Sequence, residues 1–112
     1  MARAIRVQEA AIARRLAVVL TGLGVDPPPG RTREEYARTF PRLRSAADAL
    51  HFADDLEQRQ LRAYLEALTE FPTAGARATA ANIGATQAAH LGAVRVLQGL
   101  PAAEGPFVTG AL

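Results

Sequence analysis

Five polar residues interrupt the apolar stripes of this 112-residue chain, and all are of types that can bind a metal ion: Glu9, Asp54, Glu57, Gln87 and His90. We call these five residues the polar layer. Gln87 and His90 are three residues apart, so in a helix they lie on the same face. Carboxylate oxygens and imidazole nitrogens are ligands for iron and manganese. The polar layer therefore indicates a metal protein, the remnant of one, or a helical scaffold with a polar core.

Three carboxylates in apolar stripes are costly, because an unpaired buried charge costs several kcal/mol even after the protein relaxes. Three arrangements lower that cost: a bound cation, raised pKa values that let carboxyl groups share protons, or a layer open to water. Each residue also has an interpretation without a metal. His90 fits a hydrogen-bonded core histidine, and Gln87 fits a partner for a neighbouring carboxylate. Glu9 fits an exposed position near the start of a helix, and Asp54 or Glu57 faces solvent if the register of the stripe differs by one residue.

The elements that must position the polar layer are helices. Alanine, which has the highest helix propensity, occurs 25 times. Periodicity predicts three long helices, over about 2–23, 45–70 and 74–98, and one short helix over about 32–39. These elements predict an all-α bundle that forms a single domain over residues 1–112.

Capping residues mark the ends of these helices. Thr32 and Glu35 predict a capping box, and Ser45 and Thr73 are typical N-cap residues. Gly24 is a typical residue after a helix end. A proline loop is expected over 25–31 and an irregular tail over 100–112, because proline and glycine are frequent in both.

Each long helix has an apolar stripe at the alternating spacing of four and three that is typical of a helical bundle. The first stripe is Ile5, Glu9, Ile12, Leu16, Val19 and Leu23. The second is Ala47, Leu50, Asp54, Glu57, Leu61, Tyr64, Leu68 and Phe71. The third is Ala76, Ala80, Ile83, Gln87, His90, Val94 and Leu97. A line of small residues on the third helix predicts close contact with another helix: Ala80, Gly84, Ala88 and Gly92.

Composition excludes several classes of function. The net charge is +2, and arginines alternate with acidic residues as on solvated helix faces, so a nucleic-acid partner is not expected. The chain has no cysteine, which excludes disulfides and thiolate metal sites. No apolar run is long enough to span a membrane, and the N-terminus lacks the layout of a signal peptide. A cytoplasmic location is therefore the default expectation.

Two stretches resemble the last two helices of bacterial ferritin-like domain proteins: LEQRQLRAYLEAL at 56–68 and ATQAAHLGAVRVLQGLPAAEGPFVTG at 85–110. Glu57 and Tyr64 match a glutamate and a tyrosine of that family's third helix. His90 matches the histidine of the Glu-x-x-His motif in its fourth helix, where Gln87 stands in place of the glutamate. VQEAAIARRLAVVLTGLGVDPPPG is similar to the family's second helix and its proline loop.

The family's di-iron site takes a glutamate from each of two helices and Glu-x-x-His from each of two others. The resemblance assigns three of these ligands to Glu9, Glu57 and His90. Ile12 stands in place of a histidine, Gln87 in place of a glutamate, and the family's first helix has no counterpart. The resemblance therefore implies a degenerate ferritin-like scaffold without an intact di-iron centre, acting as a binding or interaction module. It implies no cofactor and no catalytic residue, so an enzyme is not favoured.

The alternative is a metal-binding ferritin-like protein, including an oxidoreductase, that holds iron or manganese. The candidate ligands are then the polar layer itself, with missing ligands supplied by a second chain. Three long helices leave one side of a bundle open, so we also expect a homodimer or a partner that supplies a fourth helix.

Overall fold

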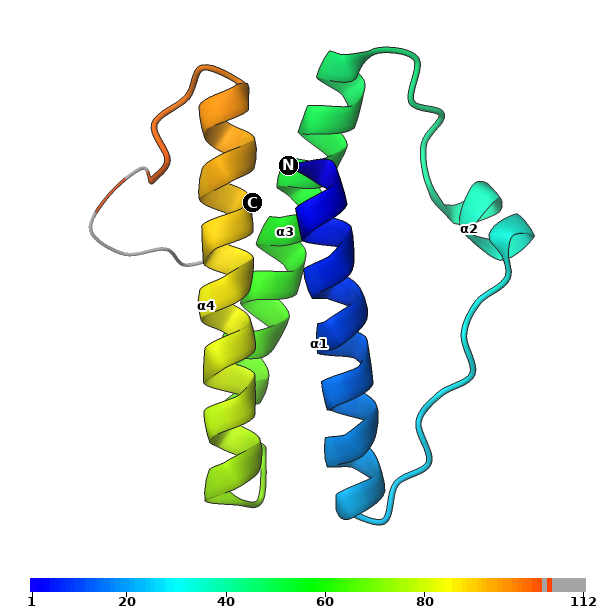
Figure 1. Cartoon of the computed structure of the whole chain (residues 1–112), viewed down its shortest axis with the longest axis vertical. Helices are drawn as coiled ribbons and strands as arrows, with labels where there is room; N and C mark the ends of the chain where they lie inside the picture. The colour runs from blue at the N-terminus through cyan, green and yellow to red at the C-terminus, as the bar shows by residue number, and fades with distance from the viewer. Residues whose placement is uncertain (104, 106–112) are drawn as a thin grey trace. The chain divides into compact units, whose positions relative to one another are not determined.

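The computed structural model describes residues 1–103 and 105. These residues form four α-helices and no strand: α1 (Ala2–Gly22), α2 (Arg33–Thr39), α3 (Ala46–Ala67) and α4 (Ala74–Leu97) (Figure 1). This confirms the all-α prediction with three long helices and one short helix. The chain divides into two compact units, Met1–Phe40 and the part from Pro41 onward, and each is described by itself.

The first unit contains α1 and α2, which are joined by residues 23–32. Residues 25–32 of this segment carry no regular secondary structure. α1 ends in a Schellman motif. The amide of Val25 donates to the carbonyl of Leu20, the amide of Gly24 donates to that of Thr21, and Gly24 has φ +75°. Glycine is suited to this position because it has no Cβ to clash in the left-handed region.

The short helix α2 begins at the predicted capping box. The Thr32 hydroxyl accepts a hydrogen bond from the backbone amide of Glu35, and the Glu35 side chain accepts one from the amide of Thr32. Two backbone amides that the helix leaves without partners are thus satisfied. α2 ends at Thr39, and the C-cap residue Phe40 is extended because Pro41 follows it.

In the second unit, Ser45 and Asp48 form a capping box that begins α3. α3 ends at Ala67, three residues before the predicted end near Glu70. The amide of Glu70 donates to the carbonyl of Ala67, a turn rather than a helical bond. Pro72 disfavours a helical conformation at Phe71, which limits how far α3 can extend.

The last helix, α4, begins at Thr73, whose hydroxyl accepts a hydrogen bond from the amide of Ala76. It ends in a second Schellman motif. Gly99 has φ +76°, and the amide of Leu100 donates to the carbonyl of Arg95. Of the predicted irregular tail, residues 100–103 and 105 are described and lie outside any helix; the rest of 100–112 lies outside the described residues.

α3 and α4 pack against each other as an antiparallel pair (Figure 1). Among the described residues, the buried apolar side chains are Leu61, Ala76, Ala80, Ile83, Leu91 and Val94. The predicted stripes of these two helices are therefore confirmed in their central turns. The outer ends of these stripes are not buried as predicted, since Ala47 is exposed and Leu97 is 55% exposed. At the ends of a helix pair the neighbouring helix covers a side chain from fewer directions.

The small residues of α4 have two different neighbours. A Cβ added to Gly84 would lie 3.8 Å from Tyr64 Cβ and 3.9 Å from Leu61 Cδ1, so the backbone of α4 lies close to α3 there. A Cβ added to Gly92 would lie 3.5 Å from the carbonyl oxygen of Ala102. The line predicted to contact one helix thus packs partly on α3 and partly on the segment after α4.

Arg95 is an exception to the expectation that arginines occupy solvated faces, because only 9% of it is exposed. Its Nε donates a hydrogen bond of 2.9 Å to the carbonyl oxygen of Pro101, which fixes the segment that follows α4.

A membrane span requires a long helix of high mean hydropathy, and the described part of the chain contains no such helix.

Candidate metal centre

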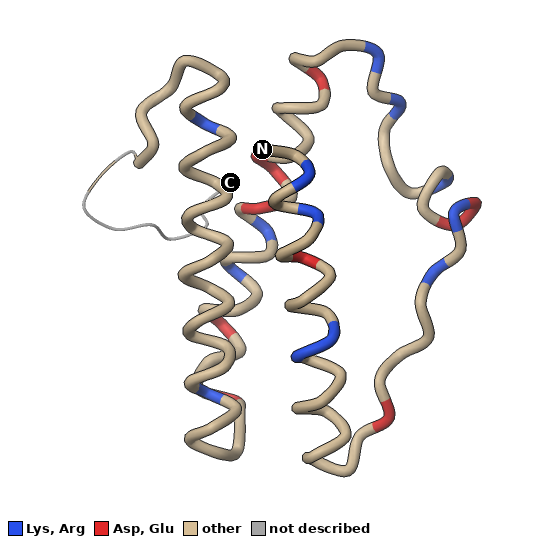
Figure 2. The backbone as a smooth tube through the Cα atoms, viewed as in Figure 1, with Lys and Arg blue, Asp and Glu red and all other residues tan. Residues whose placement is uncertain are grey.

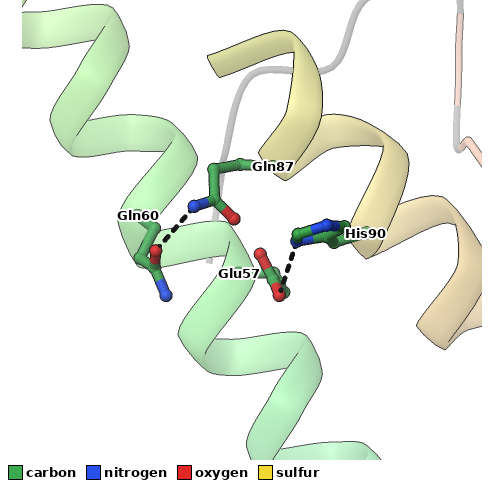
Figure 3. Close-up of polar contacts among 4 residues, drawn as sticks. All are labelled: Glu57, Gln60, Gln87 and His90. Carbon is green, nitrogen blue, oxygen red and sulfur yellow. Dashed lines mark hydrogen bonds and ion pairs between the residues drawn. The ribbon is translucent and has the colours of Figure 1, made fainter. Parts of the chain in front are cut away.

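Glu57 and His90 face each other between α3 and α4 (Figure 3). His90 Nδ1 lies 3.4 Å from Glu57 Oε1, and each residue is 5% exposed. Their prediction as facing residues on complementary stripes is confirmed. Both belong to the central turns of long helices, where the periodicity of apolar residues points their side chains toward the helix interface.

The stretch of α4 that carries His90, between Arg77 and Arg95, contains no acidic residue and no lysine or arginine (Figure 2). In that stretch His90 is therefore the only side chain that can carry a positive charge toward Glu57. A buried carboxylate is stabilised by a hydrogen-bond donor or by a cation, and His90 Nδ1 lies close enough to Glu57 for the pair to hold a cation between two facing helices.

Gln87 is fully buried, with 0% of the residue exposed. Its side-chain Nε2 donates a hydrogen bond of 2.8 Å to Oε1 of Gln60 on α3 (Figure 3). The expected partner for this amide was a neighbouring carboxylate, and the structure gives it a second amide. The sequence analysis missed Gln60, although its position three residues after Glu57 places both on one face of α3.

Asp54 is also buried, with 7% of the residue exposed. Its Oδ1 accepts a hydrogen bond of 2.5 Å from Nε2 of Gln58, one turn along α3. This bond lowers the cost of burying the carboxylate without a cation. Gln58 too was missed, although a spacing of four on a helix allows such a bond. A role for Asp54 as a metal ligand stays a prediction.

Glu9 lies on α1, in the first unit of the chain. Its membership of one site with Glu57 and His90 stays a prediction from the sequence. The described second unit thus brings together Glu57, Gln87 and His90, with Asp54 one turn from Glu57.

His51, the other histidine, is exposed near the start of α3, where its Nδ1 lies 3.3 Å from Nε2 of Gln98.

The chemistry of these side chains fits one cation better than two. A carboxylate and an imidazole from facing helices are ligands that suit iron or manganese. A di-iron site of this architecture needs two Glu-x-x-His motifs. Here Gln87 is a neutral amide, and Ile12 has no ligand atom in its side chain. The residues present therefore do not fit a di-iron centre.

In a comparison with known families, residues 1–100 match a family model described as a ferritin-like domain. No curated protein matches the sequence, and no solved structure matches it. The match covers most of the chain and includes α1, α2, α3 and α4.

Proposed function

Because the chain belongs to the ferritin-like domain family, we propose that it is a ferritin-like scaffold without a di-iron centre that holds a single divalent metal ion, iron or manganese. The observation that carries this proposal is the buried pair of Glu57 and His90, with 3.4 Å between Oε1 and Nδ1. Glu57 and His90 would hold the ion, and its positive charge would compensate the buried carboxylate.

Further ligands in this proposal are Glu9, Asp54 and the amide oxygen of Gln87, with a second chain as the source of any that are missing. When bound, iron or manganese would supply Lewis-acid and one-electron chemistry. The protein side chains would orient the ion and exclude water from it, since Glu57, Gln87 and His90 are all buried.

Metal analysis tests the proposal. Protein purified without chelators and loaded anaerobically with Fe²⁺ or Mn²⁺ is expected to keep about one equivalent per chain, in keeping with one carboxylate–imidazole site. Glu57→Gln and His90→Gln are expected to lose it, while His51→Gln keeps it because His51 is exposed near the start of α3. Two equivalents of iron with oxygen-dependent absorbance changes would contradict the proposed loss of the di-iron centre.

A second candidate function is a scaffold that binds no metal and acts as an interaction module, as the sequence analysis favoured. The specific observation in its favour is that two members of the polar layer have protein partners, Gln87 with Gln60 and Asp54 with Gln58. Protein that keeps no iron or manganese after anaerobic loading supports this candidate and overturns the first.

A further inference from the structure

We infer that Gln60 is a positioning residue that turns the amide of Gln87 so that its carbonyl oxygen faces Glu57 and His90 and serves a cation there as an oxygen ligand. This inference rests on the proposed single-metal function. The inference extends the proposed function in two ways. It gives a role to Gln60, which lies outside the polar layer, and it explains how a glutamine at position 87 remains compatible with a cation.

The argument begins with the two ends of an amide. A glutamine side chain presents an NH₂ group that donates and a carbonyl oxygen that accepts, and the two point in different directions. In this structure the NH₂ of Gln87 donates to Gln60 Oε1 at 2.8 Å. The carbonyl oxygen then lies on the side of Glu57 and His90 (Figure 3).

The consequence is electrostatic. An NH₂ group turned toward Glu57 would donate to the carboxylate and place partial positive charge where a cation would bind. The hydrogen bond to Gln60 directs the NH₂ toward α3 instead. The surroundings of Glu57 and His90 therefore gain an acceptor from Gln87, and a carbonyl oxygen is a ligand type for hard divalent cations.

The contact is specific because it joins two helices. Gln60 lies on α3 three residues after Glu57, and Gln87 lies on α4 three residues before His90. The two interactions, Gln60 with Gln87 and Glu57 with His90, are thus neighbouring links between the same two helices (Figure 3). Residues that orient metal ligands in this way commonly change metal affinity by about 10–100-fold when they are replaced.

The test compares Gln60→Met with Gln60→Glu. Methionine has a similar length and no strong acceptor, so the orientation of Gln87 is lost, whereas an ionised glutamate still accepts from the Gln87 NH₂. Co²⁺ is the probe, titrated anaerobically and followed by its visible absorbance. We expect Gln60→Met to weaken Co²⁺ binding about tenfold or more and Gln60→Glu to preserve it. Gln98→Met is the matched control, since Gln98 contacts His51.

A second measurement uses the metal-free protein. In ¹H–¹⁵N NMR spectra, the side-chain NH₂ signals of Gln87, assigned by their loss in Gln87→Met, are expected to exchange slowly with solvent. Faster exchange is expected in Gln60→Met, and slow exchange in Gln60→Glu and Gln98→Met. Circular dichroism verifies that each variant is folded.

The outcomes separate this inference from the proposed function. Absence of Co²⁺ binding to the wild-type chain overturns both the metal function and the ligand role of Gln87. Equal Co²⁺ affinity of wild type and Gln60→Met overturns the inference alone. Unchanged exchange of the Gln87 NH₂ in Gln60→Met also overturns it, because the amide would then be held by something other than Gln60.

Discussion

A carboxylate and an imidazole lie beside each other in the interface between α3 and α4, with 3.4 Å between Glu57 Oε1 and His90 Nδ1. Both residues are as buried as the apolar residues Leu61 and Leu91 of the same two helices, which are 3% and 6% exposed. Removing one member of a buried polar pair is costly because the other keeps its desolvation penalty without its partner. Replacing both by apolar side chains removes both penalties, so the two residues should be energetically coupled.

A double-mutant cycle in metal-free protein tests this coupling. Glu57→Leu and His90→Leu are each expected to lower the free energy of unfolding by about 1–3 kcal/mol. The double variant is expected to lose less than the sum, with an interaction energy of about 0.5–3 kcal/mol. Urea unfolding followed by far-UV circular dichroism gives these values. Glu66→Leu, at an exposed position of α3, is the control and should change stability by about 0.5 kcal/mol or less. Additive single effects would show that the pair is not coupled.

At the scale of the elements, local capping holds the helices that carry the site. α2 and α3 begin with capping boxes, and α1 and α4 end with glycines of positive φ. In α3, Asp48 accepts hydrogen bonds from the amides of Arg44 at 2.9 Å and Ser45 at 3.1 Å. The bond from the Arg44 backbone, together with the Ser45 side chain, holds the pKa of Asp48 below its ordinary value of 3.8.

This lowered pKa predicts an acid-sensitive start of α3. Because the folded-state pKa lies below the unfolded value, the stabilisation by Asp48 is present above pH 3.8 and is lost as the pH falls through the folded-state pKa. Asp48→Asn should therefore be less stable than wild type at neutral pH, and the difference should shrink below pH 3.8. Urea unfolding of wild type and Asp48→Asn, at neutral pH and below pH 3.8, measures this difference in the free energy of unfolding. A difference that does not change with pH would contradict the capping role of the carboxylate.

At the scale of the whole molecule, α3 and α4 leave an apolar groove of about 260 Å³ on their shared surface. Its lining combines large side chains of α3 with small ones of α4: Leu61, Tyr64, Leu65, Leu68, Ala80, Ala81, Gly84, Ala85 and Ala88. Large and small side chains on one surface can interlock with the same surface of a second copy, as a two-fold interface requires. The groove is therefore the surface at which we test the expected self-association of the chain.

Sedimentation equilibrium at micromolar protein concentration provides that test. We expect a species of about twice the chain mass of 11.9 kDa. Leu65→Glu places a charge in the groove, where Leu65 is 46% exposed, and should shift the protein toward the monomer. Leu43→Glu is the matched control, since Leu43 is 48% exposed and does not line the groove. A single wild-type species of 11.9 kDa would show that the chain does not self-associate under these conditions.

The helices and the central turns of the interface between α3 and α4 could be predicted from the amino-acid sequence alone. Capping depends on residues a few positions apart, so Thr32, Ser45 and Thr73 could be assigned without tertiary information. Helical periodicity likewise placed Glu57 and His90 on facing stripes, because side chains three or four residues apart share a helix face. The family was also recognisable from short motifs in the last two helices.

Which polar groups meet across that interface depends on how α3 and α4 pack. An amide can donate or accept in several directions, and the neighbouring helix selects one, so the bond from Gln87 to Gln60 was not predictable from spacing alone. The burial of Arg95 depends on the segment after α4, whose Pro101 carbonyl accepts from it. The exposure of Leu97 depends on where neighbouring elements end. These features require the positions of residues far apart in the chain, whereas helix caps and stripes depend on residues close together.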